Sequence, residues 1–180
     1  MNIIFLDIDG VLNNIVSNML TGKYTDSNCL GLFMDTIKRI PDCKIVLSSS
    51  WRKENKEKFI ELINKAEAYE LFQLFPFFHD DYCTPKLQGI RGNEIKKWLD
   101  DHSETEIKYV CIDDDSDFLP EQPLIQTNLR TGFSFLDSLL LLEFFDCMEA
   151  DEKKTLFAQI KHEEMLINKK KQFRVTYKGN

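Results

Sequence analysis

Two aspartates near the amino terminus are the residues in this sequence whose spacing is best suited to chemistry. Asp7 and Asp9 follow the apolar segment 3–6, and one residue separates them, so both carboxylates can leave the end of a strand on the same side. Gly10 comes next and allows the backbone to turn sharply. Two neighbouring carboxylates repel each other unless a cation or a shared proton lies between them. The pair therefore predicts a divalent metal site, an acid/base couple, or both.

A second acidic group follows a later apolar segment. Residues 109–112 read Tyr-Val-Cys-Ile and predict a strand, after which come Asp113, Asp114, Asp115 and Asp117. So many carboxylates close together need a cation to offset their repulsion, and ligation by oxygen alone favours Mg²⁺. The alternative is an acidic loop that is only solvated.

Hydroxyl and basic residues stand in the segments between these two acidic groups. Serines occupy positions 48 to 50, directly after the apolar segment 45–47 and before Trp51. Their hydroxyls can donate hydrogen bonds to an anionic ligand or cap the helix predicted from residue 53. Arg91, at the start of a further predicted helix, and Lys86, in the loop before it, can supply positive charge.

The segment 7–12, which reads Asp-Ile-Asp-Gly-Val-Leu, resembles the first motif of the haloacid dehalogenase (HAD) superfamily of phosphotransferases. This resemblance implies that Asp7 is the nucleophile that attacks phosphorus and that Asp9 is the general acid/base. The second motif of the superfamily is a hydroxyl residue at a strand end that binds the phosphoryl oxygen. We favour Ser49 over Ser48 for this role, counting back from Trp51 as in relatives that read Thr-x-Trp.

The other two motifs of the superfamily also have counterparts here. The third is a basic residue, usually lysine, and either Arg91 or Lys86 can fill that position; we favour Arg91. The fourth is an Asp-x3-Asp string, which Asp113 and Asp117 match, with Asp114 as an alternate ligand. The resemblance thus implies Mg²⁺ as the cofactor, with ligands drawn from Asp7, the backbone carbonyl of Asp9, Asp113, Asp114 and Asp117.

Apolar segments alternate with amphipathic helical patterns along the chain. This alternation predicts an α/β fold, a three-layer Rossmann-like sandwich with a central parallel sheet. The expected strands begin near Ile3, Ile45, Tyr109 and Leu124. The aromatic tract 71–78 predicts a further short strand with the loop leading into it, and residues 53–71 predict a helix.

The superfamily often carries a cap domain between its first and second motifs, and this chain has little room for one. Only 39 residues separate Asp9 from Ser48, and an amphipathic helix over residues 30–40 takes part of them. We therefore expect a minimal cap and an open site. An open site suits a phosphate that is carried on a macromolecule.

The carboxyl-terminal part differs in charge from the rest. The chain has a net charge of −7, but residues 161–180 alone carry +4, which leaves −11 for the remainder. We predict a HAD-like core over residues 1–145 and a helical extension over 146–180, which either ends the domain or leads to an absent one. Its basic end, including the lysines at 169–171, is a solvated end or a contact for anionic membrane lipid.

Composition places the chain among globular proteins made in the cytoplasm. Hydrophobic residues make up 43% and charged residues 29%, and Met1 leads into the first strand without a cleavable secretory signal. Five scattered cysteines without a Cys-x2-Cys pair predict no disulfide framework.

The motifs together imply a phosphatase that forms an aspartyl-phosphate. The strings around Trp51, Arg91 and Asp113 are similar both to HAD domains of RNA-repair proteins and to HAD-type tyrosine phosphatases that intracellular bacteria use as effectors. We favour a phosphotyrosine protein over a polynucleotide end as substrate, because the net negative charge disfavours nucleic acid and the aromatic tract can flank a phosphotyrosine ring. The effector resemblance implies export to a host cell without a cleavable signal. A third reading is a non-catalytic binding module on the same fold.

Overall fold

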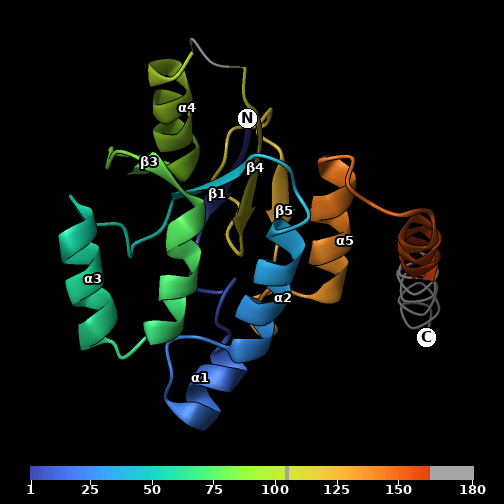
Figure 1. Cartoon of the computed structure of the whole chain (residues 1–180), viewed down its shortest axis with the longest axis horizontal. Helices are drawn as coiled ribbons and strands as arrows, with labels where there is room; N and C mark the ends of the chain where they lie inside the picture. The colour runs from blue at the N-terminus through green and yellow to red at the C-terminus, as the bar shows by residue number, and fades with distance from the viewer. Residues whose placement is uncertain (104–105, 163–180) are drawn as a thin grey trace, which may run out of the picture.

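The computed structural model describes residues 1–103 and 106–162 of the 180-residue chain. At its centre is a five-stranded sheet in the order β3-β2-β1-β4-β5, in which every pair of neighbours is parallel (Figure 1). The strands are β1 (Asn2–Leu6), β2 (Cys43–Leu47), β3 (Phe78–Cys83), β4 (Lys108–Asp113) and β5 (Leu124–Gln126). The predicted α/β fold with a central parallel sheet is confirmed.

The strand order reverses beside β1. From β1 the chain proceeds outward through β2 to β3, and then crosses back to place β4 on the other side of β1. Open parallel sheets bind ligands at such a reversal, outside the carboxyl ends of the two central strands. Asp7 directly follows β1 and Asp113 ends β4, so the two predicted acidic groups meet there.

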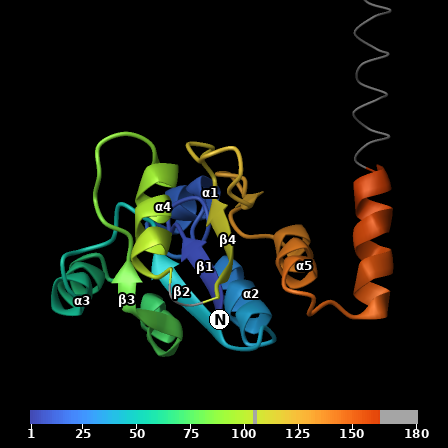
Figure 2. The ribbon, with the colours of Figure 1, turned by 90° about the horizontal axis from the view of Figure 1, so that it is seen from above.

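Helices cover both faces of the sheet, as the alternation of side chains in β1 requires. Ile3 and Phe5 point to the face covered by α4 (Arg91–Asp101), where Phe5 meets Trp98 edge to face with ring centroids 5.4 Å apart. Ile4 and Leu6 point into the larger core on the opposite face. That core includes residues of α2 (Ser27–Ile37), α3 (Lys56–Lys65) and α5 (Phe135–Phe144), and α2 and α4 lie on opposite sides of the strands (Figure 2).

The aromatic tract forms a different element from the predicted one. Residues Tyr69–Phe77 form a 3-10 helix (η1), and β3 begins only at Phe78, where the predicted strand was to end. Leu71 and Leu74 are three residues apart and both fully buried, which fits the three-residue turn of a 3-10 helix. The predicted helix over 53–71 is also shorter, since Glu67 takes a left-handed backbone (φ 52°) soon after α3 ends.

The expected minimal cap consists of one short helix. After β1 the chain forms α1 (Ile15–Thr21), which buries none of its residues, and Gly22 ends it in the left-handed conformation (φ 68°). The side chain of Asp26 then accepts hydrogen bonds from two backbone N–H groups and caps α2. The carboxyl edge of the sheet therefore lies beside a single small insertion.

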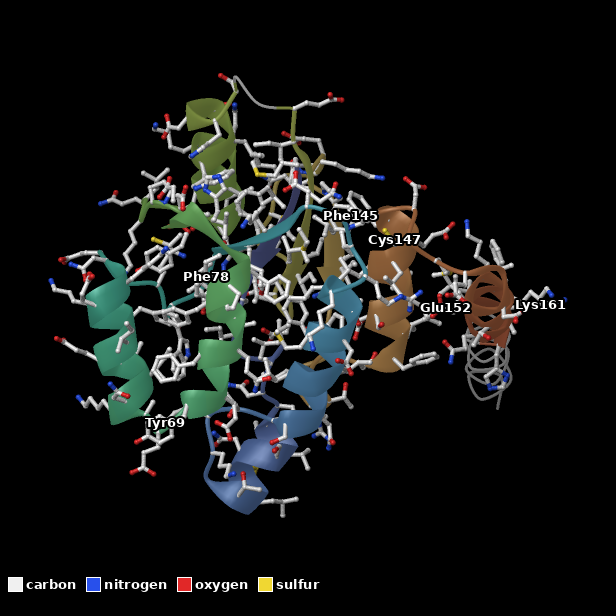
Figure 3. All side chains as sticks on the ribbon, viewed as in Figure 1. Tyr69, Phe78, Phe145, Cys147, Glu152 and Lys161 are labelled. Carbon is white, nitrogen blue, oxygen red and sulfur yellow. The ribbon has the colours of Figure 1, made fainter. Side chains whose placement is uncertain are left out.

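A last helical segment, residues 150–162, follows α5 (Figure 1). Leu156 packs into the main core at 4% exposure, and Arg39 holds Glu152 through two hydrogen bonds of 2.7 Å. Cys147, whose carbonyl oxygen also accepts from Arg39 at 3.3 Å, lies in the link between α5 and this segment, whereas Glu152 is on the segment itself (Figure 3). The lysines at 169–171, and with them the predicted lipid contact, lie outside the described residues. Within those residues, no helix is long and apolar enough to cross a membrane.

Candidate active site

Asp7 sits at the carboxyl end of the central strand and is almost fully buried. Its backbone N–H donates to the carbonyl of Ile112 on β4 at 3.0 Å, which continues the pairing of the two strands. One carboxylate oxygen accepts from the backbone N–H of Ile8 at 2.8 Å. The other lies 3.1 Å from the Arg91 guanidinium. The side chain is therefore fixed at the end of the sheet.

The Arg91 guanidinium bridges the two acidic groups. The same nitrogen, Nη1, that approaches Asp7 also donates to the carboxylate of Asp113, which is fully buried. Arg91 opens α4, and its backbone N–H donates to Asp117 at 3.0 Å. The favoured candidate for the third motif thus lies between the carboxylates. Lys86, the other candidate, makes no ion pair with them within the described residues and lines a neighbouring pocket.

Three of the predicted metal ligands converge. Asp7, Asp113 and Asp114 each place a carboxylate oxygen within 4.8 Å of the others, so the cluster can hold a metal ion. Gly10 makes room for this arrangement, because a Cβ there would overlap the carboxyl group of Asp114, and its backbone is left-handed (φ 72°). Asp117 lies outside the cluster of three and holds the start of α4 instead.

The charges in the cluster favour a bound cation. Burial raises the pKa of Asp7, although Arg91 and Ser49 lower it in part. Burial and the neighbouring Asp7 carboxylate raise the pKa of Asp113 to about 7, and the same two causes raise the pKa of Asp114. One guanidinium thus faces three crowded carboxylates. Because all three donors are oxygens, the residues present fit a hard divalent ion.

Asp9 is exposed at the mouth of the site, and two neutral donors orient it. The indole N–H of Trp51 donates to one carboxylate oxygen at 3.0 Å, and the side-chain amide of Asn13 donates to the other at 2.9 Å. Asn13 is itself held, since its amide oxygen accepts from the backbone N–H of Gly10 at 2.8 Å. The sequence reasoning used Trp51 only as a marker and missed Asn13, which stands in a polar segment that offers no pattern.

Both serines considered as phosphate ligands lie at the end of β2. The hydroxyl of Ser49 lowers the pKa of Asp7 in part and accepts from the backbone N–H of Trp51 at 3.3 Å. The hydroxyl of Ser48 is buried and finds no partner within the described part of the chain. Leaving a buried hydroxyl without a hydrogen-bond partner costs free energy. A ligand in the site that accepted a hydrogen bond from Ser48 would remove this cost.

A buried ion pair ties the loop after β2 to α4. Arg52 donates to Glu94 at 2.6 Å, and both side chains are only 9% exposed. Glu94 also accepts from the backbone N–H of Leu87 at 3.0 Å, and Arg52 donates to the carbonyl of Ser49 at 3.3 Å. The pair thereby joins the serine segment to the helix that carries Arg91. The sequence analysis missed it because the partners lie 42 residues apart.

A five-stranded parallel sheet with an Asp-x-Asp pair after β1, hydroxyls after β2, a basic residue opening α4 and carboxylates after β4 defines a HAD superfamily domain of the phosphatase type. The chain belongs to the family described as the HAD domain in Swiss Army Knife RNA repair proteins, whose model matches residues 3–137. Neither the curated proteins nor the solved structures gave a match.

Proposed function

We propose that this protein is a Mg²⁺-dependent phosphatase that removes a terminal phosphate from a polynucleotide, RNA in the first place. The observation that carries the chemistry is the convergence of Asp7, Asp113 and Asp114 around Arg91, with Asp9 beside them. The family description, which refers to RNA repair, supports the substrate class.

The phosphotyrosine substrate favoured by the sequence finds less support. Its argument used the aromatic tract, yet Phe75 and Phe78 pack on the buried Phe59 with ring centroids 6.0 Å away. The ring in contact with Asp9 is that of Trp51, and the centroid of the Tyr24 ring lies 5.8 Å from the Trp51 centroid. The family match refers to no protein substrate. A phosphotyrosine peptide therefore serves as the rival substrate in the test.

In the first step, a carboxylate oxygen of Asp7 attacks the phosphorus of the terminal phosphate. The bond between phosphorus and the ribose oxygen breaks, and Asp9 gives its proton to that oxygen as it leaves. Arg91 and the hydroxyls of Ser48 and Ser49 hold the phosphoryl oxygens. The product of this step is a phosphoryl group on Asp7 and a free ribose hydroxyl.

In the second step, Asp9 takes a proton from water, and the water oxygen attacks the phosphorus on Asp7. The bond between phosphorus and the Asp7 oxygen breaks, which releases inorganic phosphate and restores both carboxyl groups. Trp51 and Asn13 keep Asp9 oriented for both proton transfers.

The metal ion would be held by Asp7, Asp113 and Asp114, with the backbone carbonyl of Asp9 as a further ligand. When bound, Mg²⁺ supplies positive charge that keeps these carboxylates ionised and offsets the charge of the phosphate. Asp117 holds the start of α4, so its contribution would be indirect.

Initial rates on three substrates test this proposal: 3′-phosphorylated RNA, 5′-phosphorylated RNA and a phosphotyrosine peptide, each with Mg²⁺ and with EDTA. We expect one RNA end to be dephosphorylated, EDTA to abolish the reaction, and Asp7→Asn to lower kcat by at least about 10³-fold because the nucleophile is lost. Asp9→Asn should lower it by about 10²- to 10⁴-fold.

Asp35→Asn, at an exposed aspartate on α2, is the matched control and should keep the wild-type rate. Turnover that survives Asp7→Asn would show that Asp7 is not the nucleophile. Turnover of the peptide alone would overturn the substrate class. No Asp7-dependent turnover of any substrate would favour the binding-module reading.

A further inference from the structure

A basic pocket lies on the β3 side of the carboxylate site. It has a volume of about 330 Å³ and is formed by the segments that follow β2 and β3. Four basic side chains line it against a single acidic one: Arg52, Lys53, Lys58 and Lys86 against Glu54. Such a local excess of positive charge stands out in a chain whose net charge is −7.

Two of these lysines have no counter-charge of their own. Glu54 forms an ion pair with Lys58, and Arg52 forms one with Glu94. Lys53 and Lys86 form no ion pair with any residue that the structure describes. Arg52 adds a further free donor, because its Nε is buried without a hydrogen-bond partner within the same residues, on a side chain only 9% exposed. The pocket therefore has unsatisfied capacity for an anion.

The pocket and the catalytic carboxylates share one edge of the sheet. Arg52 donates to the carbonyl of Ser49 at 3.3 Å, and the Ser49 hydroxyl is among the groups that lower the pKa of Asp7. On the other wall, the backbone N–H of Thr84 donates to the carbonyl of Leu47 at 2.9 Å, at the end of β2. A single extended ligand can thus reach from the catalytic site into the pocket along the ends of neighbouring strands.

We propose that this pocket binds a backbone phosphodiester of the same polynucleotide whose terminal phosphate lies at Asp7. The inference rests on the proposed function and narrows it to strands of at least two nucleotides. A substrate with one phosphate would leave the pocket without an anion, whereas a polynucleotide carries a phosphate at every nucleotide. The negative net charge of the chain was the reason to disfavour nucleic acid as substrate. The basic pocket removes this objection, because a polyanion is attracted by the charge beside the binding site and not by the total charge of the chain.

Binding of a fluorescent, end-phosphorylated RNA decamer to the full chain, measured by anisotropy in EDTA, tests the pocket without turnover. We expect Lys53→Ala/Lys86→Ala to weaken binding by about tenfold and to flatten its salt dependence, because contacts to phosphate are lost. The matched control, Lys96→Ala/Lys97→Ala, removes the same charge from exposed lysines of α4 and should stay within twofold of the wild type.

Catalysis gives a second readout. Lys53→Ala should lower kcat/KM for the RNA decamer, chiefly through KM, and leave kcat/KM for a nucleoside monophosphate within twofold of the wild type. Equal RNA affinity of the pocket variant and the control variant would overturn the subsite. The subsite would also be overturned if the pocket variant lost affinity for an acidic phosphopeptide and kept its affinity for RNA.

The two proposals fail separately. Loss of RNA affinity in the pocket variant, without Asp7-dependent hydrolysis of any substrate in the wild type, would overturn the proposed function and support RNA binding by the pocket. Asp7-dependent hydrolysis with unchanged RNA affinity in the pocket variant would overturn the subsite alone.

Discussion

The position of one guanidinium decides how the acidic residues can work together. Arg91 lies 3.1 Å from Asp7 and also pairs with Asp113, so a single cation serves the proposed nucleophile and the proposed metal ligand. Such a side chain offsets charge in the site before any phosphate arrives and can then turn its remaining donors toward the substrate.

Replacing this side chain should therefore affect kcat strongly. We expect Arg91→Ala to lower kcat on phosphorylated RNA by about 10²- to 10³-fold. Arg91→Lys should recover part of the rate, since it keeps the charge and loses the planar fork. Steady-state kinetics on folded variants measure this, with Arg130→Ala at an exposed arginine as control. Wild-type kcat in Arg91→Ala would assign the third motif to Lys86.

At the level of single residues, the sequence predicted those that lie at strand ends. Asp7 and Asp113 were predictable because parallel strands bring their carboxyl ends to one edge, where pattern and chemistry coincide. The contacts that orient them were not predictable. Trp51 contacts Asp9 and Arg52 contacts Glu94, and in each pair the two residues are 42 positions apart in the sequence. No local sequence pattern predicts a contact between residues so far apart.

Among the elements, α4 depends most closely on a neighbouring loop. The backbone N–H of Gly92 donates to the carbonyl of Asp117 at 3.1 Å, and its carbonyl accepts from the side chain of Gln122 at 2.9 Å. A Cβ on Gly92 would stand 2.5 Å from the backbone nitrogen of Leu119. The glycine thus allows the start of the helix, and Arg91 with it, to approach the loop after β4.

We expect Gly92→Ala to destabilise the protein by about 1–3 kcal/mol, because the added methyl group must push the loop away. It should also lower kcat, since Arg91 would move with the helix. Urea unfolding and steady-state kinetics measure the two effects. Gly31→Ala is the matched control: a Cβ there meets nothing within 4 Å, so alanine should stabilise α2 by about 0.5–1 kcal/mol. A stabilising effect at both positions would contradict the close approach.

The aromatic tract shows where the sequence predicted the wrong element. The segment around Phe75 has the composition of a strand, but Leu71 and Leu74 are buried at a spacing of three residues, as in a 3-10 helix. Apolar residues alone do not distinguish these two structures when the segment is short. The central parallel sheet, in contrast, was predictable from the alternation of apolar and amphipathic segments, because parallel strands need helical connections between them.

At the scale of the whole molecule, we propose that residues 1–145 are sufficient for a folded, active domain. The residues that follow then add stability. Met148 and Leu156 both pack into the main core, and burying a side chain of this kind contributes about 1.5–3 kcal/mol. A chain ending at residue 145 should keep its activity and unfold at a lower urea concentration.

Two variants of the full chain support this test. Leu156→Ala should destabilise the protein by about 2 kcal/mol, whereas Phe157→Ala, at a side chain that is 66% exposed, should have little effect. An inactive or unfolded 1–145 protein would instead make the last helical segment part of the core domain.

The hydrogen bond between Trp51 and Asp9 has a consequence for how the molecule can be observed. The chain has only two tryptophans, and the other, Trp98, is stacked on His102 with ring centroids 3.8 Å apart. The emission of an indole responds to charge and to hydrogen bonding at its nitrogen. We therefore expect the intrinsic fluorescence of Trp51 to change when a ligand binds beside the proposed general acid, which gives a signal of site occupancy that needs no added label.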